Sequence, residues 1–185
     1  MNATEDLIVR DARLDERSAI RDLTLTAYAE YARIMQPSAW AGLKQAITDA
    51  LDGTEPTERI VAERNGKLMG SVLLYPPAAD AYGDLTERAH WPEVRLLSVA
   101  PEARGQGIGR ALLEECVRRA RQSGASLLGL HTSESMKVAL KLYERMGFVR
   151  APEYDFQPEG AELVQAFLLP LERGYQWQPI STVPK

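Results

Sequence analysis

A chain of 185 residues, 45% of them hydrophobic, can bury one sizeable core but is too short for two ordinary domains. Its formal net charge of −4 gives no indication of a surface for nucleic acid or for an anionic membrane. The single cysteine, Cys116, excludes an internal disulfide framework and a cysteine-based metal site, and two histidines give no case for a metal.

The N-terminal part of the chain predicts a strand followed by two helices. Residues 1–6 are polar and acidic, unlike a signal peptide, and no apolar run approaches the length of a membrane span, so we expect a cytoplasmic protein. Ile8 and Val9 begin a short strand. A helical spacing predicts a first helix to about Tyr31; the residues that carry it are Asp15, Ala19, Ile20, Leu23 and Ala27.

Pro37 ends that helix, and Ser38 is expected to cap a second one that stops at Gly53. Residues 59–63 and 68–75 then predict two strands. They are joined by Asn65-Gly66, the strongest short signal for a hairpin. Residues 76–92 contain several prolines and no period, which predicts a long loop, and loops of this length are uncommon unless they are functional or mobile.

The central part predicts a strand at residues 94–100, a glycine-rich turn, and a helix from Ile108 that stops at Ser123-Gly124. The inner face of this helix carries Ile108, Ala111, Leu112, Cys116 and Ala120. Its outer face carries Arg110, Glu114, Arg118 and Arg121.

Residues 126–130 predict the next strand, after which Thr132 or Ser133 is expected to cap a helix that Gly147 ends. One face of that helix carries Met136, Ala139, Leu140 and Tyr143. Residues 148–150 are expected to be extended, and residues 163–169 to form the last strand. The chain thus predicts one mixed α/β sheet with helices on both faces in a single domain, residues 1–172, followed by a tail without a period, residues 173–185.

The glycine-rich turn at residues 104–109 is the strongest functional signal. A strand, a glycine turn and a helix start present unpaired N–H groups at a positive dipole end, which suits a phosphate-bearing cofactor. The phosphate loop of kinases and ATPases would need Gly-Lys-Ser or Gly-Lys-Thr, whereas this chain has Gly109-Arg110-Ala111. A dinucleotide fingerprint would need G-x-G-x-x-G, but the glycines stand at 105, 107 and 109. It would also need an acid about 20 residues on to hold a ribose, whereas the next strand ends in Leu130-His131-Thr132.

The pattern that fits is R-x-x-G-x-G, from Arg104 to Gly109, together with Leu-Tyr-Glu-Arg-x-Gly-Phe at residues 142–148. With these two blocks the chain resembles the GNAT superfamily of N-acetyltransferases over about residues 93–150. The resemblance implies a mainly antiparallel, twisted sheet flanked by helices. It also implies direct transfer of an acetyl group, in a ternary complex, from acetyl-CoA to an amine of a small molecule or a peptide.

The resemblance implies a cofactor site in which backbone N–H groups of the turn bind the pyrophosphate and the preceding strand pairs with the pantetheine arm. The residues concerned are Leu97, Ser98, Val99, Arg104, Gly105, Gln106, Gly107, Ile108, Gly109, Arg110 and Ala139. One position departs from the family. Many members carry an asparagine that bonds the pantetheine arm where this chain has Met136.

The resemblance also implies two catalytic residues. Tyr143 stands where the family has the acid that protonates the leaving thiolate, and a phenol, with its reference pKa near 10, is protonated at neutral pH. A tyrosine on an apolar helix face is also often only part of the core. Glu93 matches the glutamate that some members use as the base; a solvated acid at a strand end, a water chain or His131 are the alternatives left open.

For the amine acceptor we expect contacts with the first helices and the loops over the central strand, namely Tyr28, Tyr31 and Trp91. Further aromatic candidates are Trp40, Tyr82 and His90. A rival of another class is a domain that binds acyl-CoA without turnover, which would have no need of an acid at Tyr143. A phosphate-binding oxidoreductase comes third because of the glycine spacing. A homodimer is compatible with the sequence, which does not identify the acceptor.

Overall fold

The computed structural model describes residues 7–54, 57–87 and 89–172. Its centre is a seven-stranded sheet in the order β1-β2-β3-β4-β5-β7-β6, in which only β4 and β5 are parallel. The strands are β1 Ile8–Asp11, β2 Glu58–Arg64, β3 Lys67–Tyr75, β4 Glu93–Val99, β5 Leu127–Ser133, β6 Val149–Arg150 and β7 Val164–Pro170. The mixed, mainly antiparallel sheet predicted from the sequence is therefore confirmed.

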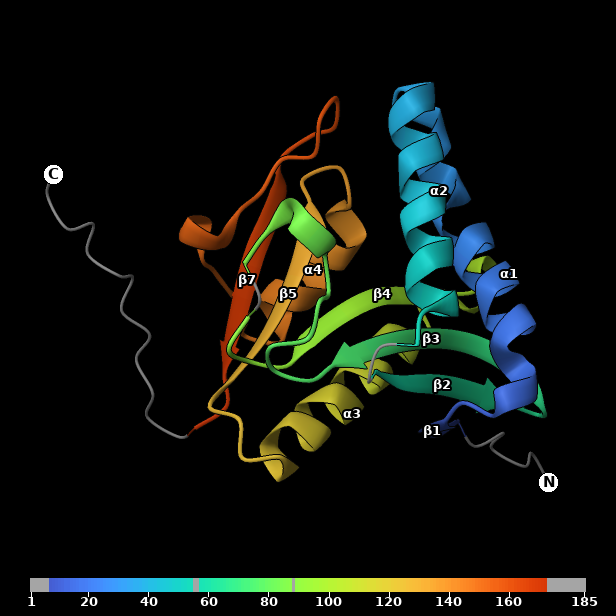
Figure 1. The fold of residues 1–185 in the computed structure, drawn as a ribbon. Coiled ribbons are helices and arrows are strands. Elements are labelled where there is room, and N and C mark those ends of the chain that lie inside the picture. Colours follow the sequence, from blue (N-terminus) through green and yellow to red (C-terminus); the bar gives the residue numbers. More distant parts are fainter. Residues whose placement is uncertain (1–6, 55–56, 88, 173–185) are drawn as a thin grey trace, which may run out of the picture.

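Four α-helices and several short 3₁₀ turns connect the strands. The helices are α1 Arg17–Tyr28, α2 Pro37–Asp52, α3 Ile108–Gln122 and α4 Lys137–Arg145. The 3₁₀ turns are Leu14–Glu16, Ala29–Arg33, Gly83–Leu85, Pro101–Ala103 and Pro152–Tyr154. Figure 1 shows α1 and α2 over one face of the β1–β4 half and α3 against the other, with β5 and β7 turned strongly away from that half.

Each face of the sheet has its own core because the apolar side chains of the strands alternate between the two faces. Under α1 and α2, Ile20 and Ile47 pack with Val61 and Leu73. The larger core lies under α3 and α4 and includes Ile60, Val72, Val94, Leu112, Cys116, Leu128, Tyr143 and Phe148. The predicted inner face of α3 is buried. In the first helix Ile20 and Ala27 are buried as predicted, whereas Ala19 is exposed and Asp15 is exposed in the turn before α1.

Two turns form for the reasons that the sequence suggests. Asn65 and Gly66 both have positive φ, 53° and 74°, as a two-residue hairpin turn between β2 and β3 requires. Gly147 follows α4 with φ 90°, so it serves as the left-handed residue after the helix. Residues 76–92 form no regular strand or α-helix apart from the 3₁₀ turn Gly83–Leu85, in keeping with the predicted loop, residue 88 being outside the described part.

Two predicted helix caps are wrong. Helix α2 begins at Pro37, one residue before Ser38, because proline has no N–H to satisfy and is well suited to the first helical position; the cap is Gln36. Thr132 and Ser133 do not cap α4, since β5 continues through both and pairs them with Gln165 and Val164. Helix α4 starts only after Met136.

The predicted tail, residues 173–185, and the acidic residues 1–6 lie outside the described residues. Within the described part, no helix is both long enough and apolar enough to cross a membrane.

Candidate active site

The two parallel strands β4 and β5 are joined only at their beginning and then separate. Glu93 pairs with Gly129 and Val94 with Leu130, and the pairing ends there. Beyond this point β4 bulges: its register against β3 shifts, and Leu96 has a φ of 52°. A groove of about 750 Å³ lies along the diverging strands, between α1 on one side and the glycine turn and α4 on the other.

The glycine turn lines one end of this groove. Gly105 and Gly107 have φ of 74° and 80°, which side chains rarely adopt, and a Cβ atom on either residue would meet no atom within 4 Å. Gly107 is the N-cap of α3, and no side chain caps this helix. The N-terminal N–H groups of α3 therefore remain for an anion, as the sequence suggested.

Three polar residues of the turn differ in their placement. Arg104 lines the groove and donates to the main-chain oxygen of Ala27 at 2.9 Å and to Glu30 Oε2 at 2.8 Å, which ties the turn to the end of α1. Arg110 also lines the groove. Gln106 does not: its side chain accepts a hydrogen bond from Arg64 at 2.6 Å on the exposed surface.

Strand β4 contributes its backbone to the groove. Leu97, Ser98 and Val99 all line it, but the Ser98 hydroxyl is buried 2.9 Å from the hydroxyl of Ser71 and 3.2 Å from that of Thr24. This buried hydroxyl cluster fixes α1 against β3 and β4. What Ser98 offers to the groove is therefore its main chain, as the sequence analysis expected for an extended ligand arm.

Helix α4 places Tyr143 and Ala139 at the groove, next to Met136. Burial raises the pKa of the Tyr143 phenol, and the neighbouring phenols of Tyr28 and Tyr31 add to the shift, so the group is protonated at neutral pH. Among the described residues, no group accepts a hydrogen bond from the Tyr143 hydroxyl. A buried phenol that keeps its proton and lines a groove is suited to donate it to a bound molecule.

A second hydroxyl beside the groove has no partner within the described part of the chain. Thr132, at the end of β5, lines the groove, and its buried Oγ1 atom makes no hydrogen bond. Buried hydroxyls are almost always paired, so an unpaired one beside a groove suggests a contact to a ligand. Sequence reasoning placed Thr132 as a helix cap and missed this.

Tyr28 and Tyr31, expected at the acceptor, both line the groove from the end of α1 and the turn that follows. The Tyr28 hydroxyl donates to the Leu97 carbonyl at 3.5 Å, and the two rings pack edge to face. The other aromatic candidates lie elsewhere. Trp40 lies on α2 under Lys44, outside both cavities, whereas Trp91, Tyr82 and His90 line a second, smaller pocket.

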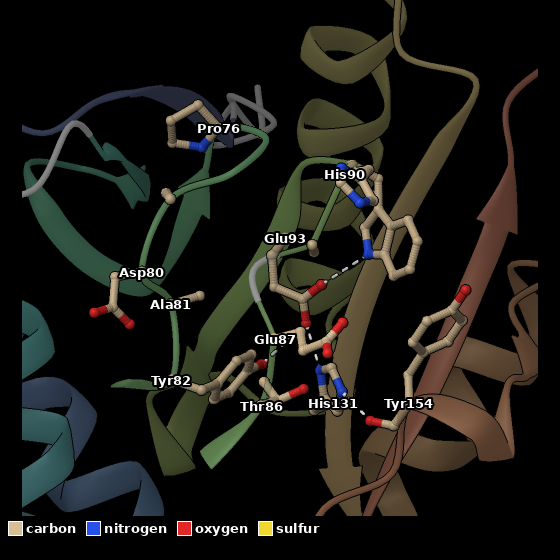
Figure 2. A pocket seen from close by; sticks show the side chains of 13 residues that line it. Pro76, Asp80, Ala81, Tyr82, Thr86, Glu87, His90, Glu93, His131 and Tyr154 are labelled. Carbon is tan, nitrogen blue, oxygen red and sulfur yellow. Dashed lines mark hydrogen bonds and ion pairs between the residues drawn. The ribbon is translucent and has the colours of Figure 1, made fainter. Parts of the chain in front are cut away.

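Glu93 lines this second pocket, and Figure 2 shows its carboxyl group directed toward His131. It is only 2% exposed, and three side chains form hydrogen bonds with it; Tyr82 and Trp91 donate. The distances are 2.6 Å to His131 Nδ1, 3.0 Å to the Tyr82 hydroxyl and 3.2 Å to Trp91 Nε1. A carboxylate has about four lone-pair sites, so Glu93 keeps about one free. It is not the solvated strand-end acid considered above.

His131 connects the two cavities, since it lines both the groove and the pocket. Its Nε2 atom lies 3.0 Å from the Tyr154 main-chain oxygen, which can only accept, and its Nδ1 atom faces Glu93. The Nε2 atom therefore donates to this carbonyl. Gly129 and His131 alternate along β5 with buried Leu128 and Leu130, and this period of two is the sequence signal that places His131 on the sheet face opposite these leucines.

The described residues contain no group of three or more His, Cys, Asp or Glu side chains placed to hold a metal ion. The chemistry available at the groove is thus an anion cradle, a protonated phenol and, through His131, a buried carboxylate. This combination can hold a phosphate-bearing molecule and move protons at a reacting group.

Comparison with known sequences agrees with this geometry. The profile of the acetyltransferase (GNAT) family matches residues 19–148. The chain is 34% identical over 110 residues to an IAA acetyltransferase of Azospirillum brasilense, covering 59% of this chain and 64% of that protein. It is 32% identical over 96 residues to a mycothiol acetyltransferase of Cellulomonas flavigena, covering 52% of this chain and 28% of that protein. The chain thus spans less than two thirds of either relative.

Solved structures show the same fold. A GNAT-family acetyltransferase of Brucella melitensis, in complex with acetyl-CoA, superposes with a TM-score of 0.60 at 21% identity, covering 95% of this chain and 93% of that one. A GNAT-family acetyltransferase of Staphylococcus aureus superposes with a TM-score of 0.64 at 13% identity, covering 90% of this chain and 100% of that one.

Proposed function

Because the chain belongs to the acetyltransferase (GNAT) family, we propose that it transfers an acetyl group from acetyl-CoA to a primary amine of a small molecule or peptide. The observation that carries the proposal is the separation of β4 from β5 after Val94 and Leu130. It opens a groove with an uncapped helix start at one end and a protonated phenol in its wall.

The residues that line the groove fit the two parts of coenzyme A. The N–H groups at Gly105, Gly107 and Gly109 would hold the pyrophosphate, with Arg104 and Arg110 adding positive charge. The backbone of Leu97 to Val99 would pair with the pantetheine arm, and the unpaired hydroxyl of Thr132 would give the wall a polar contact that Met136 does not offer. Acetyl-CoA would supply the acetyl group as an activated thioester.

Tyr143 is proposed as the general acid. When the amine nitrogen attacks the thioester carbon, the C–S bond breaks and the sulfur takes up negative charge. Tyr143 lines the groove and retains its proton at neutral pH, so it can donate that proton to the sulfur.

Glu93 is proposed to accept the proton that the attacking nitrogen loses. Its one free lone-pair site faces a pocket that shares His131 with the groove. His131, held between Glu93 and the Tyr154 carbonyl, would act as a positioning residue that fixes the carboxylate. The proton thus moves from nitrogen to Glu93 while Tyr143 gives its own to sulfur, and the charges balance.

Direct transfer is favoured over an acetylated enzyme intermediate. Cys116 is the only cysteine, it is fully buried in the core, and burial raises the pKa of its thiol to about 12. A thiol with that pKa is a poor nucleophile at neutral pH.

The test is to incubate the protein with acetyl-CoA and a panel of primary amines and to measure N-acetylated amine by mass spectrometry. We expect product for at least one amine, formed about 100-fold or more slowly by Tyr143→Phe. Binding of acetyl-CoA in calorimetry without transfer to any amine would overturn the proposal and favour a domain that binds acyl-CoA without turnover.

A further inference from the structure

The pocket at Glu93 adjoins the groove at His131, which lines both, and it is much smaller, with a volume of about 60 Å³. It lies between β4, β5 and residues 76–87 and 89–91, and Figure 2 shows Tyr82 and His131 at its lower end. Trp91 Nε1 donates to Glu93 at 3.2 Å. This volume is room for roughly four to six water-sized spheres. A narrow space of this size, walled by aromatic side chains, favours a single methylene chain over a ring or a branched carbon.

Aromatic rings form the walls of the pocket. Tyr82 packs edge to face on His131 with ring centres 4.8 Å apart, and Trp91 packs on Tyr154 at 4.9 Å. Gly129 leaves the space that Trp91 and Glu93 occupy, since a Cβ atom there would collide with both side chains. Aromatic faces attract cations, most strongly where water is excluded.

The charged residues that line the pocket are mostly acidic. Asp80 and Glu87 are exposed, and Glu93 is buried. None of the described lining residues is lysine or arginine. Arg95 lies close by but stacks over the Tyr82 ring at 4.3 Å, donates to the Ala81 carbonyl, and lines the groove instead. His131 Nδ1 is held by Glu93 Oε1.

We propose that this pocket receives the acceptor, and that the acceptor is a slim, unbranched primary alkylammonium group. The inference rests on the proposed function and adds the chemical class of its acceptor. Asp80 and Glu87 attract the cation, and the rings of Tyr82 and Trp91 flank its chain. The ammonium first releases one proton to water. The neutral nitrogen then meets the free site of Glu93 beside His131, and Glu93 takes the second proton when the nitrogen attacks.

The first test compares n-butylamine with tert-butylamine, which have the same carbon count and charge at neutral pH. We expect kcat/KM for the linear amine to be higher by about tenfold or more, the usual scale for a misfitting methyl group. Equal values, or a preference for the branched amine, would overturn the proposal while leaving acetyl transfer in place.

A second test removes the charge at the pocket entrance with the double variant Asp80→Asn, Glu87→Gln. We expect KM for n-butylamine to rise about threefold or more, with kcat unchanged and the difference lost at high salt. The matched control is Asp84→Asn, an exposed acid of the same segment that does not line the pocket. An unchanged KM in the double variant, or an equal rise in the control, would contradict the role of these carboxylates.

Calorimetry separates the failure of this proposal from failure of the proposed function. Protein saturated with coenzyme A is titrated with each butylamine. Tighter binding of n-butylamine without any transfer would support the pocket assignment and overturn catalysis. Binding of neither amine, or no preference between them, would overturn the pocket assignment whatever the transfer assay shows.

Discussion

The Nδ1 atom of His131 lies 2.6 Å from Oε1 of Glu93, and this contact joins the first residue of β4 to the point where β5 leaves it. Both side chains are almost fully buried, with 6% and 3% of their surface exposed. The pair therefore closes the inner end of the strand separation and lies where both cavities meet.

Glu93→Gln should lose activity and stability together. The amide places an N–H group where one of the three hydrogen-bond partners, His131, Tyr82 or Trp91, now finds an oxygen, and an unsatisfied buried polar group costs about 1–3 kcal/mol. Loss of the proton acceptor should lower kcat by about 100- to 10,000-fold. Urea unfolding and acetyl-transfer rates measure the two effects, with exposed Glu102→Gln as the control. Activity within about threefold of wild type, far below that range, would leave Glu93 with a structural role only.

Tyr143→Phe should retain binding of coenzyme A and lose turnover. The ring keeps its packing against Phe148, and only the hydroxyl is removed. Loss of a general acid lowers kcat by about 100- to 10,000-fold, with the dissociation constant nearly unchanged. Calorimetry and rate measurements test this, and Tyr75→Phe, a buried tyrosine outside both cavities, is the matched control. Nearly full activity in the Tyr143 variant would assign this residue to the core.

Gly107→Glu should abolish binding of coenzyme A because it places a side chain and a negative charge at the helix start proposed for the pyrophosphate. Gly124→Glu is a close control: Gly124 has the same φ of 80°, has no atom within 4 Å of a Cβ position, and lies just beyond the other end of α3. The backbone strain should be similar in both variants. Calorimetry should therefore show loss of binding only at position 107, and equal binding in the two variants would argue against this anion site.

Gly129→Ala should damage the pocket and spare the groove. A Cβ atom there would collide with Trp91 Nε1 and come within 2.5 Å of Glu93 Oε2, and overpacking of this kind costs about 1–3 kcal/mol. We expect KM for the amine to rise while the affinity for coenzyme A stays constant. Gly42→Ala, in an open position on α2, should be neutral or stabilising. A parallel loss of coenzyme A affinity would show that the two cavities are not independent.

Glu16 should make the fold sensitive to acid. Two hydrogen bonds from Arg10, at 2.7 and 2.9 Å, lower the pKa of Glu16 from 4.5 to about 2. The pKa is lower in the folded state, so the stabilisation is complete above pH 4.5 and is lost as the pH falls toward 2. It amounts to about 3 kcal/mol at most. Urea unfolding at pH 7 and pH 3 should show a steeper pH dependence for wild type than for Glu16→Gln; equal dependence would contradict this account.

Local signals predicted most of the fold. The Asn65-Gly66 turn, the periodicity of α3 and the glycine after α4 each act within a few residues, where the chain itself fixes the conformation. Two predicted helix caps were wrong, although Ser38 and Thr132 are good capping residues. Pro37 starts α2 one residue before Ser38. Pairing with β7 extends β5 through Thr132. Sheet pairing depends on distant residues, and no local pattern reports it.

The residues of the candidate site likewise fall into those that lie in short sequence motifs and those that only sheet pairing brings together. The glycine turn and Tyr143 lie in short motifs, so their positions at the groove could be expected from the sequence. The pocket could not, because Glu93, Tyr82, His131 and Tyr154 come from four separate segments and meet only when β4 and β5 pair at Gly129. Nothing in the sequence near Thr132 indicates that its hydroxyl lacks a partner.

The burial of Cys116 has a practical consequence for measurement. Each acetyl transfer frees one coenzyme A thiol, which a colorimetric disulfide reagent can detect continuously. Most proteins contribute a background from their own cysteines, but this chain has one, fully buried and with its pKa raised to about 12. The wild-type protein can therefore be assayed in real time without a cysteine-free variant, and a slow late rise in colour would report unfolding, not catalysis.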